Sequence, residues 1–156
     1  MEIKILMVCL GNICRSPIAE GVMQSVMKKN NLTGKVDSAG ILLYHSGQAP
    51  DKRAIRISGD NCVDISSQRA RQIKPSDFKE YDFIFTMDRS VHNSILNLAT
   101  DDKVRNKVHL FMEYAGYPEG TQVPDPYYSG MEAFQQVYEL VNDACEKIIS
   151  KWNDNR

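Results

Sequence analysis

Residues 3–17 read Ile3-Lys4-Ile5-Leu6-Met7-Val8-Cys9-Leu10-Gly11-Asn12-Ile13-Cys14-Arg15-Ser16-Pro17. Residues 3–8 are nearly all apolar, which is typical of a strand buried on both faces of a sheet. Gly11 and its neighbours indicate a tight turn. Ser16-Pro17 indicates a helix start, in which a capping side chain precedes proline at the first helical position. Apolar residues then recur every four positions, which predicts an amphipathic helix to about Lys29.

The alternation of strands and helices continues along the chain. We predict further strands at 35–38, 81–87 and 108–111, and helices at 51–59, after Asp88, and from a capping box at 129–132 to Trp152. Residues 66–75 and 115–128 are predicted to be irregular, because the first run is polar and the second is rich in Gly and Pro. The predicted fold class is α/β, with one doubly wound three-layer domain over residues 1–156 and ligands beyond the carboxyl ends of parallel strands.

Size and composition exclude several classes of protein. A chain of 156 residues can bury one core, and its net charge of -1 gives no reason to expect nucleic acid or a membrane as partner. The apolar run 3–10 is too short for a membrane span and lacks the flanks of a signal peptide, so a cytoplasmic location is expected. Cys9, Cys14, Cys62 and Cys145 form neither a disulfide scaffold nor paired zinc ligands. We therefore expect no metal and no cofactor.

The loop that begins at Cys9 has the features of an anion site. Gly11 permits a backbone shape that most residues resist, so that successive N–H groups can point inward. The following helix adds the positive end of its dipole, and Arg15 brings a planar fork of donors that suits phosphate. In such surroundings a thiol ionises readily, which would hold a nucleophile beneath a bound phosphorus. A cysteine that ends a buried strand is more often a small core residue, so this interpretation depends on the full string rather than on Cys9 and Arg15 alone.

The string 8–17 resembles the signature of low-molecular-weight protein tyrosine phosphatases. The resemblance covers almost the whole chain and includes Asp37-Ser38-Ala39-Gly40, Ala70-Arg71-Gln72-Ile73, Thr86-Met87-Asp88 and Val123-Pro124-Asp125-Pro126-Tyr127-Tyr128. It implies a four-stranded parallel sheet with helices on both faces and an enzyme that hydrolyses phosphotyrosine in proteins. The family's nucleophile falls on Cys9 and its phosphate-binding arginine on Arg15. Its loop-stabilising residues fall on Asn12 and Ser16, and the expected contacts with substrate or a similar oxyanion also include Leu10, Gly11, Ile13 and Cys14.

Asp125 lies between two prolines, which restrict its backbone to extended conformations. Taken alone, an aspartate beside proline indicates a plain turn. The resemblance implies instead that Asp125 is the general acid, which protonates the departing phenol oxygen and then activates water as a base. A positioned acid of this kind typically contributes about 10²–10⁴-fold to the rate.

Three tyrosines are candidates for the walls of a substrate slot. Tyr127 and Tyr128 follow the acid directly, and Tyr44 lies in the loop after the second strand. A deep slot lined by these rings would admit phosphotyrosine and leave the shorter phosphoserine out of reach of Cys9. Surface tyrosines on loops also occur without any such role.

The chain departs from the family in two places, and Cys14 raises a separate question. Residues 41–43 are unusually apolar, which leaves the substrate preference open, and Gln68 replaces a histidine that supports the loop asparagine in some relatives. Cys14 is either a buried filler or, as the resemblance implies, a partner for a reversible disulfide with Cys9 that protects the thiolate from oxidation. Cys62 and Cys145 are expected to be structural, and solvated or half-buried positions are expected for His45, His92 and His109.

Three other functions are alternatives to phosphotyrosine hydrolysis. An arsenate reductase of similar fold needs further relay cysteines, for which Cys62 and Cys145 are poorly placed. Protein-arginine phosphatases tend to carry threonine at the position of Ile13. A non-enzymatic phosphopeptide reader would use Arg15 but would need neither a thiolate nor an acid.

Overall fold

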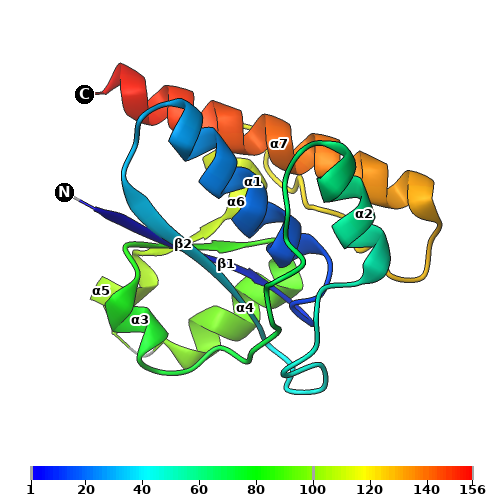
Figure 1. Ribbon diagram of the computed structural model, residues 1–156. Coiled ribbons are helices and arrows are strands. Elements are labelled where there is room, and N and C mark those ends of the chain that lie inside the picture. Colours follow the sequence, from blue (N-terminus) through cyan, green and yellow to red (C-terminus); the bar gives the residue numbers. More distant parts are fainter. Residues whose placement is uncertain (1, 100, 156) are drawn as a thin grey trace.

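A computed structural model shows four parallel strands covered by helices on both faces (Figure 1). It describes residues 2–99 and 101–155. The strands are β1 (Ile3–Cys9), β2 (Gly34–Gly40), β3 (Phe83–Thr86) and β4 (Val108–Leu110), in the order β2-β1-β3-β4. The predicted α/β class and parallel sheet are therefore confirmed. Strand order changes direction between β1 and β3, which places the Cys9 loop at the point where ligands bind in such sheets.

The helices divide between the two faces because residues of β1 alternate in direction. Ile5 and Met7 face one core and Leu6 and Val8 face the other, and all four are fully buried. The first core contains residues of α1 (Arg15–Lys29), α2 (Lys52–Asp60), α6 (Phe111–Tyr114) and α7 (Met131–Asp154). The second contains residues of α3 (Asp77–Glu80) and α4 (Arg89–Leu98) and is contacted by α5 (Asp102–Arg105).

Two predicted helix caps are wrong. Helix α1 begins two residues earlier than expected, at Arg15 rather than Pro17, and the Ser16 side chain does not cap it. Helix α7 begins after Gly130 without a side-chain cap, so the capping box at 129–132 does not form. By contrast, Asp88 caps α4 as predicted, because its Oδ1 accepts a hydrogen bond from Val91 N at 2.8 Å.

The predicted irregular segment 66–75 is attached to the end of β2 by backbone hydrogen bonds. Gly40 N donates to Arg71 O at 2.8 Å, and Ile73 N donates to Gly40 O at 2.8 Å. This attachment brings Arg71 beside the Cys9 loop, although the two residues are 62 positions apart in sequence. Among the described residues, no helix is long and apolar enough to cross a membrane.

Candidate active site

The loop between β1 and α1 takes its shape from Asn12 rather than from Gly11. Asn12 has φ 59°, in the left-handed region that asparagine tolerates better than most residues. Gly11 is not in this region, so the predicted reason for glycine there is wrong. A Cβ atom on Gly11 would lie 3.1 Å from His45 Cδ2, so a larger residue there would require a small shift of the His45 ring.

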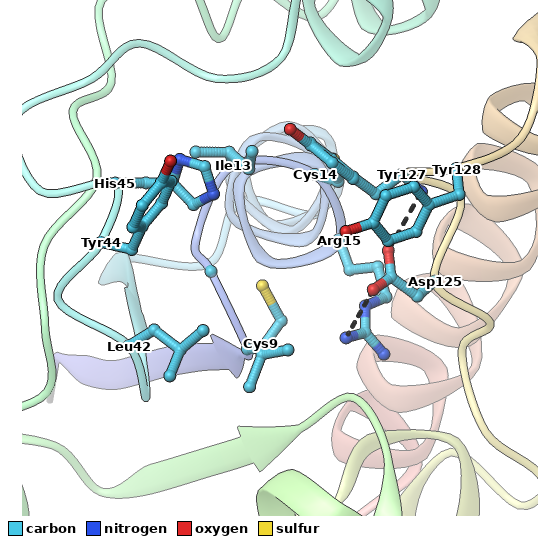
Figure 2. A pocket seen from close by; sticks show the side chains of 12 residues that line it. Cys9, Ile13, Cys14, Arg15, Leu42, Tyr44, His45, Asp125, Tyr127 and Tyr128 are labelled. Carbon is cyan, nitrogen blue, oxygen red and sulfur yellow. Dashed lines mark hydrogen bonds and ion pairs between the residues drawn. The ribbon is translucent and has the colours of Figure 1, made fainter.

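The Cys9 sulfur points into a cleft and is surrounded by donors (Figure 2). Asn12 N donates to Cys9 Sγ at 3.3 Å, and Ser16 Oγ lies 3.0 Å from the same sulfur. The N–H groups of Gly11 and Ile13 have no acceptor among the described residues. Donors at the sulfur and unused N–H groups in the same loop are what an oxyanion site requires.

Asn12 fixes the direction of the Ser16 hydroxyl. Asn12 Nδ2 donates to Ser16 Oγ at 2.8 Å and to Ser38 Oγ at 2.9 Å, and its Oδ1 accepts from Arg71 N at 3.0 Å. Because Ser16 Oγ accepts from Asn12, its own hydrogen is free to point at the Cys9 sulfur. Asn12 and Ser16 are 2% and 0% exposed, so their side chains support the loop from behind rather than line the cleft.

Gln68 does not support the loop asparagine, as the histidine at its position does in some relatives. Its Nε2 donates to Pro17 O at 3.1 Å, and its buried Oε1 has no hydrogen-bond partner among residues 2–99 and 101–155. No hydrogen bond joins Gln68 to Asn12 among the described residues. The asparagine is therefore held by Ser38 and Arg71 without a side chain from position 68.

Arg15 is buried and oriented by two segments that are distant in sequence. Its Nη1 lies 2.6 Å from Asp88 Oδ2 and donates to Val123 O at 3.1 Å. Burial alone would lower the pKa of Arg15, but Cys9 and Asp88 outweigh it and raise the pKa. Arg15 thus carries a fixed positive charge beside the sulfur. The sequence predicted Asp88 only as a helix cap, because its contact with Arg15 depends on β3 lying beside β1 in the folded chain.

Asp125 lies at the open side of the same cleft (Figure 2). One carboxylate oxygen, Oδ2, is 3.9 Å from Arg15 Nη2, and the other accepts from Tyr127 N at 3.1 Å. Its side chain is 46% exposed, which leaves it accessible to a leaving group and to water. Cys9, Arg15 and Asp125 therefore meet at one place, as the sequence analysis expected.

The cleft has a volume of about 340 Å³. The predicted slot residues Tyr44, Tyr127 and Tyr128 all line it, together with Leu10, Gly11, Ile13 and Cys14. Tyr44 and Tyr128 are 83% and 94% exposed, so they stand at the rim. Leu42 and His45 also line the cleft, and neither had been assigned to it from the sequence.

The two loop cysteines differ in their surroundings. Burial, reinforced by Asp51, raises the pKa of the Cys14 thiol well above its usual range. Cys14 therefore stays protonated at neutral pH and does not compete with Cys9 as a nucleophile. Cys145 is fully buried in the core, as expected of a structural residue, whereas Cys62 is exposed.

Comparison with known proteins agrees with this geometry. The sequence profile of the family described as low molecular weight phosphotyrosine protein phosphatase matches residues 4–156. A phosphatase of that description from Schizosaccharomyces pombe is 40% identical over 151 residues, which cover 95% of this chain and 96% of the relative. The crystal structure of a protein tyrosine phosphatase from Entamoeba histolytica, with Hepes in the active site, matches with a TM-score of 0.92 and 36% identity over 99% of both chains. Wzb from Vibrio vulnificus, solved in complex with benzylphosphonate, matches with a TM-score of 0.81 and 31% identity over 100% of both chains.

Proposed function

The chain belongs to the low molecular weight phosphotyrosine protein phosphatase family, and on that premise we propose that Cys9, Arg15 and Asp125 carry out its hydrolysis of phosphotyrosine. The observation that carries the assignment is the convergence of these three side chains on one cleft. The proposal treats residues 1–156 as one catalytic domain, of which the family profile matches 4–156.

In the first step, the Cys9 thiolate attacks phosphorus while the bond to the phenol oxygen breaks. Arg15 and the N–H groups of the loop bind the non-bridging oxygens, whose negative charge they stabilise without a metal. Asp125 donates its proton to the departing oxygen, so tyrosine leaves as a neutral phenol. The product of this step is a phosphocysteine at Cys9.

In the second step, water replaces the sulfur on phosphorus. The Asp125 carboxylate accepts a proton from water, whose oxygen attacks phosphorus as the bond to sulfur breaks. Inorganic phosphate is released and the thiolate is restored. The Ser16 hydroxyl and Asn12 N–H, which contact sulfur in the free enzyme, stabilise it as a leaving group.

The depth of the cleft supports a preference for phosphotyrosine. Cys9 is only 3% exposed at the floor, while Tyr44 and Tyr128 stand at the rim. A phenyl ring spans this depth and contacts the rim rings, whereas phosphoserine is too short. We expect phosphotyrosine peptides to be hydrolysed much faster than matched phosphoserine peptides, and equal rates would refute the slot.

Ile13 adds an apolar wall to the cleft. Faster turnover of phosphoarginine than of phosphotyrosine would favour the arginine-phosphatase alternative.

The decisive experiment compares aryl phosphate hydrolysis by the wild type, Cys9→Ser and Asp125→Ala. Cys9→Ser should abolish turnover and leave no trapped phosphoenzyme. Asp125→Ala should lower the rate by about 10²–10⁴-fold for substrates with poor leaving groups. Full turnover by Cys9→Ser would exclude this mechanism.

Two further parts of the proposal concern the oxidation of the thiols, and the substrates and cellular compartment of the enzyme. We propose that peroxide oxidises the Cys9 thiolate to a sulfenic acid. The Cys14 thiol then displaces the sulfenic oxygen, which leaves with the thiol proton as water, and a disulfide forms. Thiol reduction should then restore activity, and Cys14→Ser should lose that recovery. Phosphotyrosine proteins are the proposed substrates and phosphate-like oxyanions the proposed ligands of the loop. Free thiols at Cys9, Cys14, Cys62 and Cys145 support a reducing, cytoplasmic compartment, which cell fractionation would test.

A further inference from the structure

Arg53 joins the first turn of α2 to the segment that follows the proposed acid. Its Nη2 donates to Tyr127 O at 2.9 Å, and its Nη1 donates to Ser129 O at 2.6 Å. These acceptors lie 74 and 76 residues from Arg53 in the chain. Both ends of the guanidinium therefore bind the backbone of a loop that has no regular secondary structure of its own.

The guanidinium is itself held firmly. Asp51 Oδ1 accepts from Arg53 Nε at 3.0 Å, and Asp51 Oδ2 accepts from Arg53 Nη2 at 2.9 Å. The guanidinium carbon also lies 4.4 Å from the centre of the Phe134 ring on α7. A planar fork with two carboxylate bonds and a ring beneath it has little freedom, so it can fix the position of whatever it binds.

The residue that Arg53 fixes is also the residue that orients Asp125. Tyr127 accepts from Arg53 through its carbonyl, and it donates through its N–H to Asp125 Oδ1 at 3.1 Å. Movement of the Tyr127 backbone would therefore turn the carboxyl group. Among the described residues, the only other ion-pair or hydrogen-bond partner of that carboxyl group is Arg15, at 3.9 Å.

The same turn of α2 is anchored to the phosphate loop. Asp51 N donates to Ile13 O at 2.8 Å, so the helix start that carries Arg53 is tied to the loop around Cys9. A chain of contacts thus runs from the loop through Asp51 and Arg53 to Tyr127 and Asp125. We propose that Arg53 is a positioning residue, which holds the general acid at a fixed place relative to the nucleophile. This inference rests on the proposed function, since it assigns Arg53 a task only if Asp125 is the acid.

A series of aryl phosphates with different leaving groups separates this role from a purely structural one. The ratio kcat/KM reports the steps up to leaving-group release, and a phenol of high pKa needs the proton of Asp125 more than one of low pKa. With Arg53→Gln, kcat/KM for phenyl phosphate should fall by about tenfold to a hundredfold, the scale expected when a catalytic group is misplaced by roughly 1 Å. For 2,4-dinitrophenyl phosphate, kcat/KM should fall by less than about twofold, because its leaving group departs without a proton.

Three controls make the result decisive. Arg56→Gln removes an exposed arginine from the same helix and should leave both substrates unaffected. Arg53→Lys keeps the charge without the fork, so it should recover only part of the loss. In an Asp125→Asn background, Arg53→Gln should cause no further loss with phenyl phosphate, because the group it positions is absent.

The outcomes distinguish this inference from the proposed function. If Arg53→Gln lowers kcat/KM equally for all leaving groups, or if its effect persists in the Asp125→Asn background, Arg53 is not a positioning residue. If Asp125→Asn itself gives no steeper dependence on the leaving group, the proposed acid is wrong and this inference falls with it. Thermal unfolding of each variant, measured alongside, shows whether a uniform loss comes from partial unfolding.

Discussion

Asn12 combines an unusual backbone conformation with the support of the nucleophile. It has φ 59°, and its side chain contacts both Ser16 and Ser38. Asn12→Ala should therefore lose stability through both backbone strain and lost hydrogen bonds. Asn12→Gly should lose stability only through the lost hydrogen bonds. We expect the alanine variant to be less stable than the glycine variant by about 1–2 kcal/mol in urea unfolding.

Activity should respond differently from stability at this position. Both Asn12 variants should lose about tenfold to a hundredfold in kcat/KM, the equivalent of one hydrogen bond to a charged group. The measurement is steady-state hydrolysis of phosphotyrosine peptide by folded variants. Unchanged activity in Asn12→Gly would mean that the loop keeps its shape without the side chain.

Glu20 makes the free energy of unfolding depend on pH. Its Oε1 accepts from Ser38 Oγ at 2.7 Å, and burial raises the pKa of the carboxyl group to about 7 from 4.5, with Asp37 adding to the shift and Ser38 and Arg71 opposing it. A carboxyl group with a raised pKa in the folded state favours folding when it is protonated. Its contribution is therefore fully present below pH 4.5 and is lost as the pH rises through 7.

Glu20→Gln should remove this dependence, because an amide does not titrate. The free energy of unfolding of the variant, relative to the wild type, should increase between pH 5 and 7.5. Ser38→Ala is a useful companion, since it removes the hydrogen bond but leaves the buried carboxyl group. Parallel pH profiles for wild type and Glu20→Gln would show that Glu20 does not titrate in this range.

Individual site residues were predictable where the local sequence itself carried the signal. Cys9 and Arg15 stand in one short loop, so a strand, a turn and a helix suffice to bring them together. The contact of Arg15 with Asp88 was not predictable, because it depends on β1 and β3 lying side by side. Asp88 was identified only as a helix cap, and it fills both roles with its two oxygens.

At the scale of elements, two helical glycines offer a matched pair. A Cβ atom at Gly21 in α1 would lie 2.5 Å from Ile65 Cγ2 and 2.8 Å from Val63 Cγ1, whereas one at Gly59 in α2 would meet nothing within 4 Å. Gly21→Ala should therefore destabilise the protein by about 1–3 kcal/mol through overpacking. Gly59→Ala should stabilise it by up to about 1 kcal/mol, because alanine favours the helix. Thermal unfolding checks both, and a stabilised Gly21→Ala would show that Val63 and Ile65 move aside freely.

The elements also show why helix positions were easier to predict than helix ends. Apolar spacing defined the long faces of α1 and α7, and their buried residues match that spacing. Ser16 was expected to cap α1, but its hydroxyl serves the Cys9 sulfur instead. The four-residue helices α3 and α5 carry too little periodicity to be distinguished from loops.

At the scale of the molecule, the site is assembled from segments far apart in the chain. The nucleophile loop, Asp88 and Val123 meet only in the folded state, through Arg15. Inorganic phosphate should therefore bind the native state alone and raise the free energy of unfolding by about 2.7 kcal/mol at a hundred times its Kd. Arg15→Lys should lose most of this gain. An equal gain in that variant would mean that phosphate acts as a general stabilising salt.

The layered architecture was predictable because alternating strand and helix patterns permit few arrangements. The order of the strands was not, since β1 pairs with β3 through residues about 78 positions apart, such as Ile5 with Phe83. Sequence periodicity contains no information about which distant strands become neighbours. The apolar patterns predicted four strands, in agreement with the resemblance to a known family, and the structure supplies their order.

The rim of the cleft carries most of the large apolar side chains that the described residues expose. Of the seven large apolar side chains that the described residues expose, five line the cleft: Leu10, Leu42, Tyr44, Tyr127 and Tyr128. A sixth, Leu43, lies between two of these in sequence. Removing such a surface from water is favourable. A polypeptide with apolar residues beside its phosphotyrosine would therefore dissociate more slowly from this face than from the other faces of the molecule.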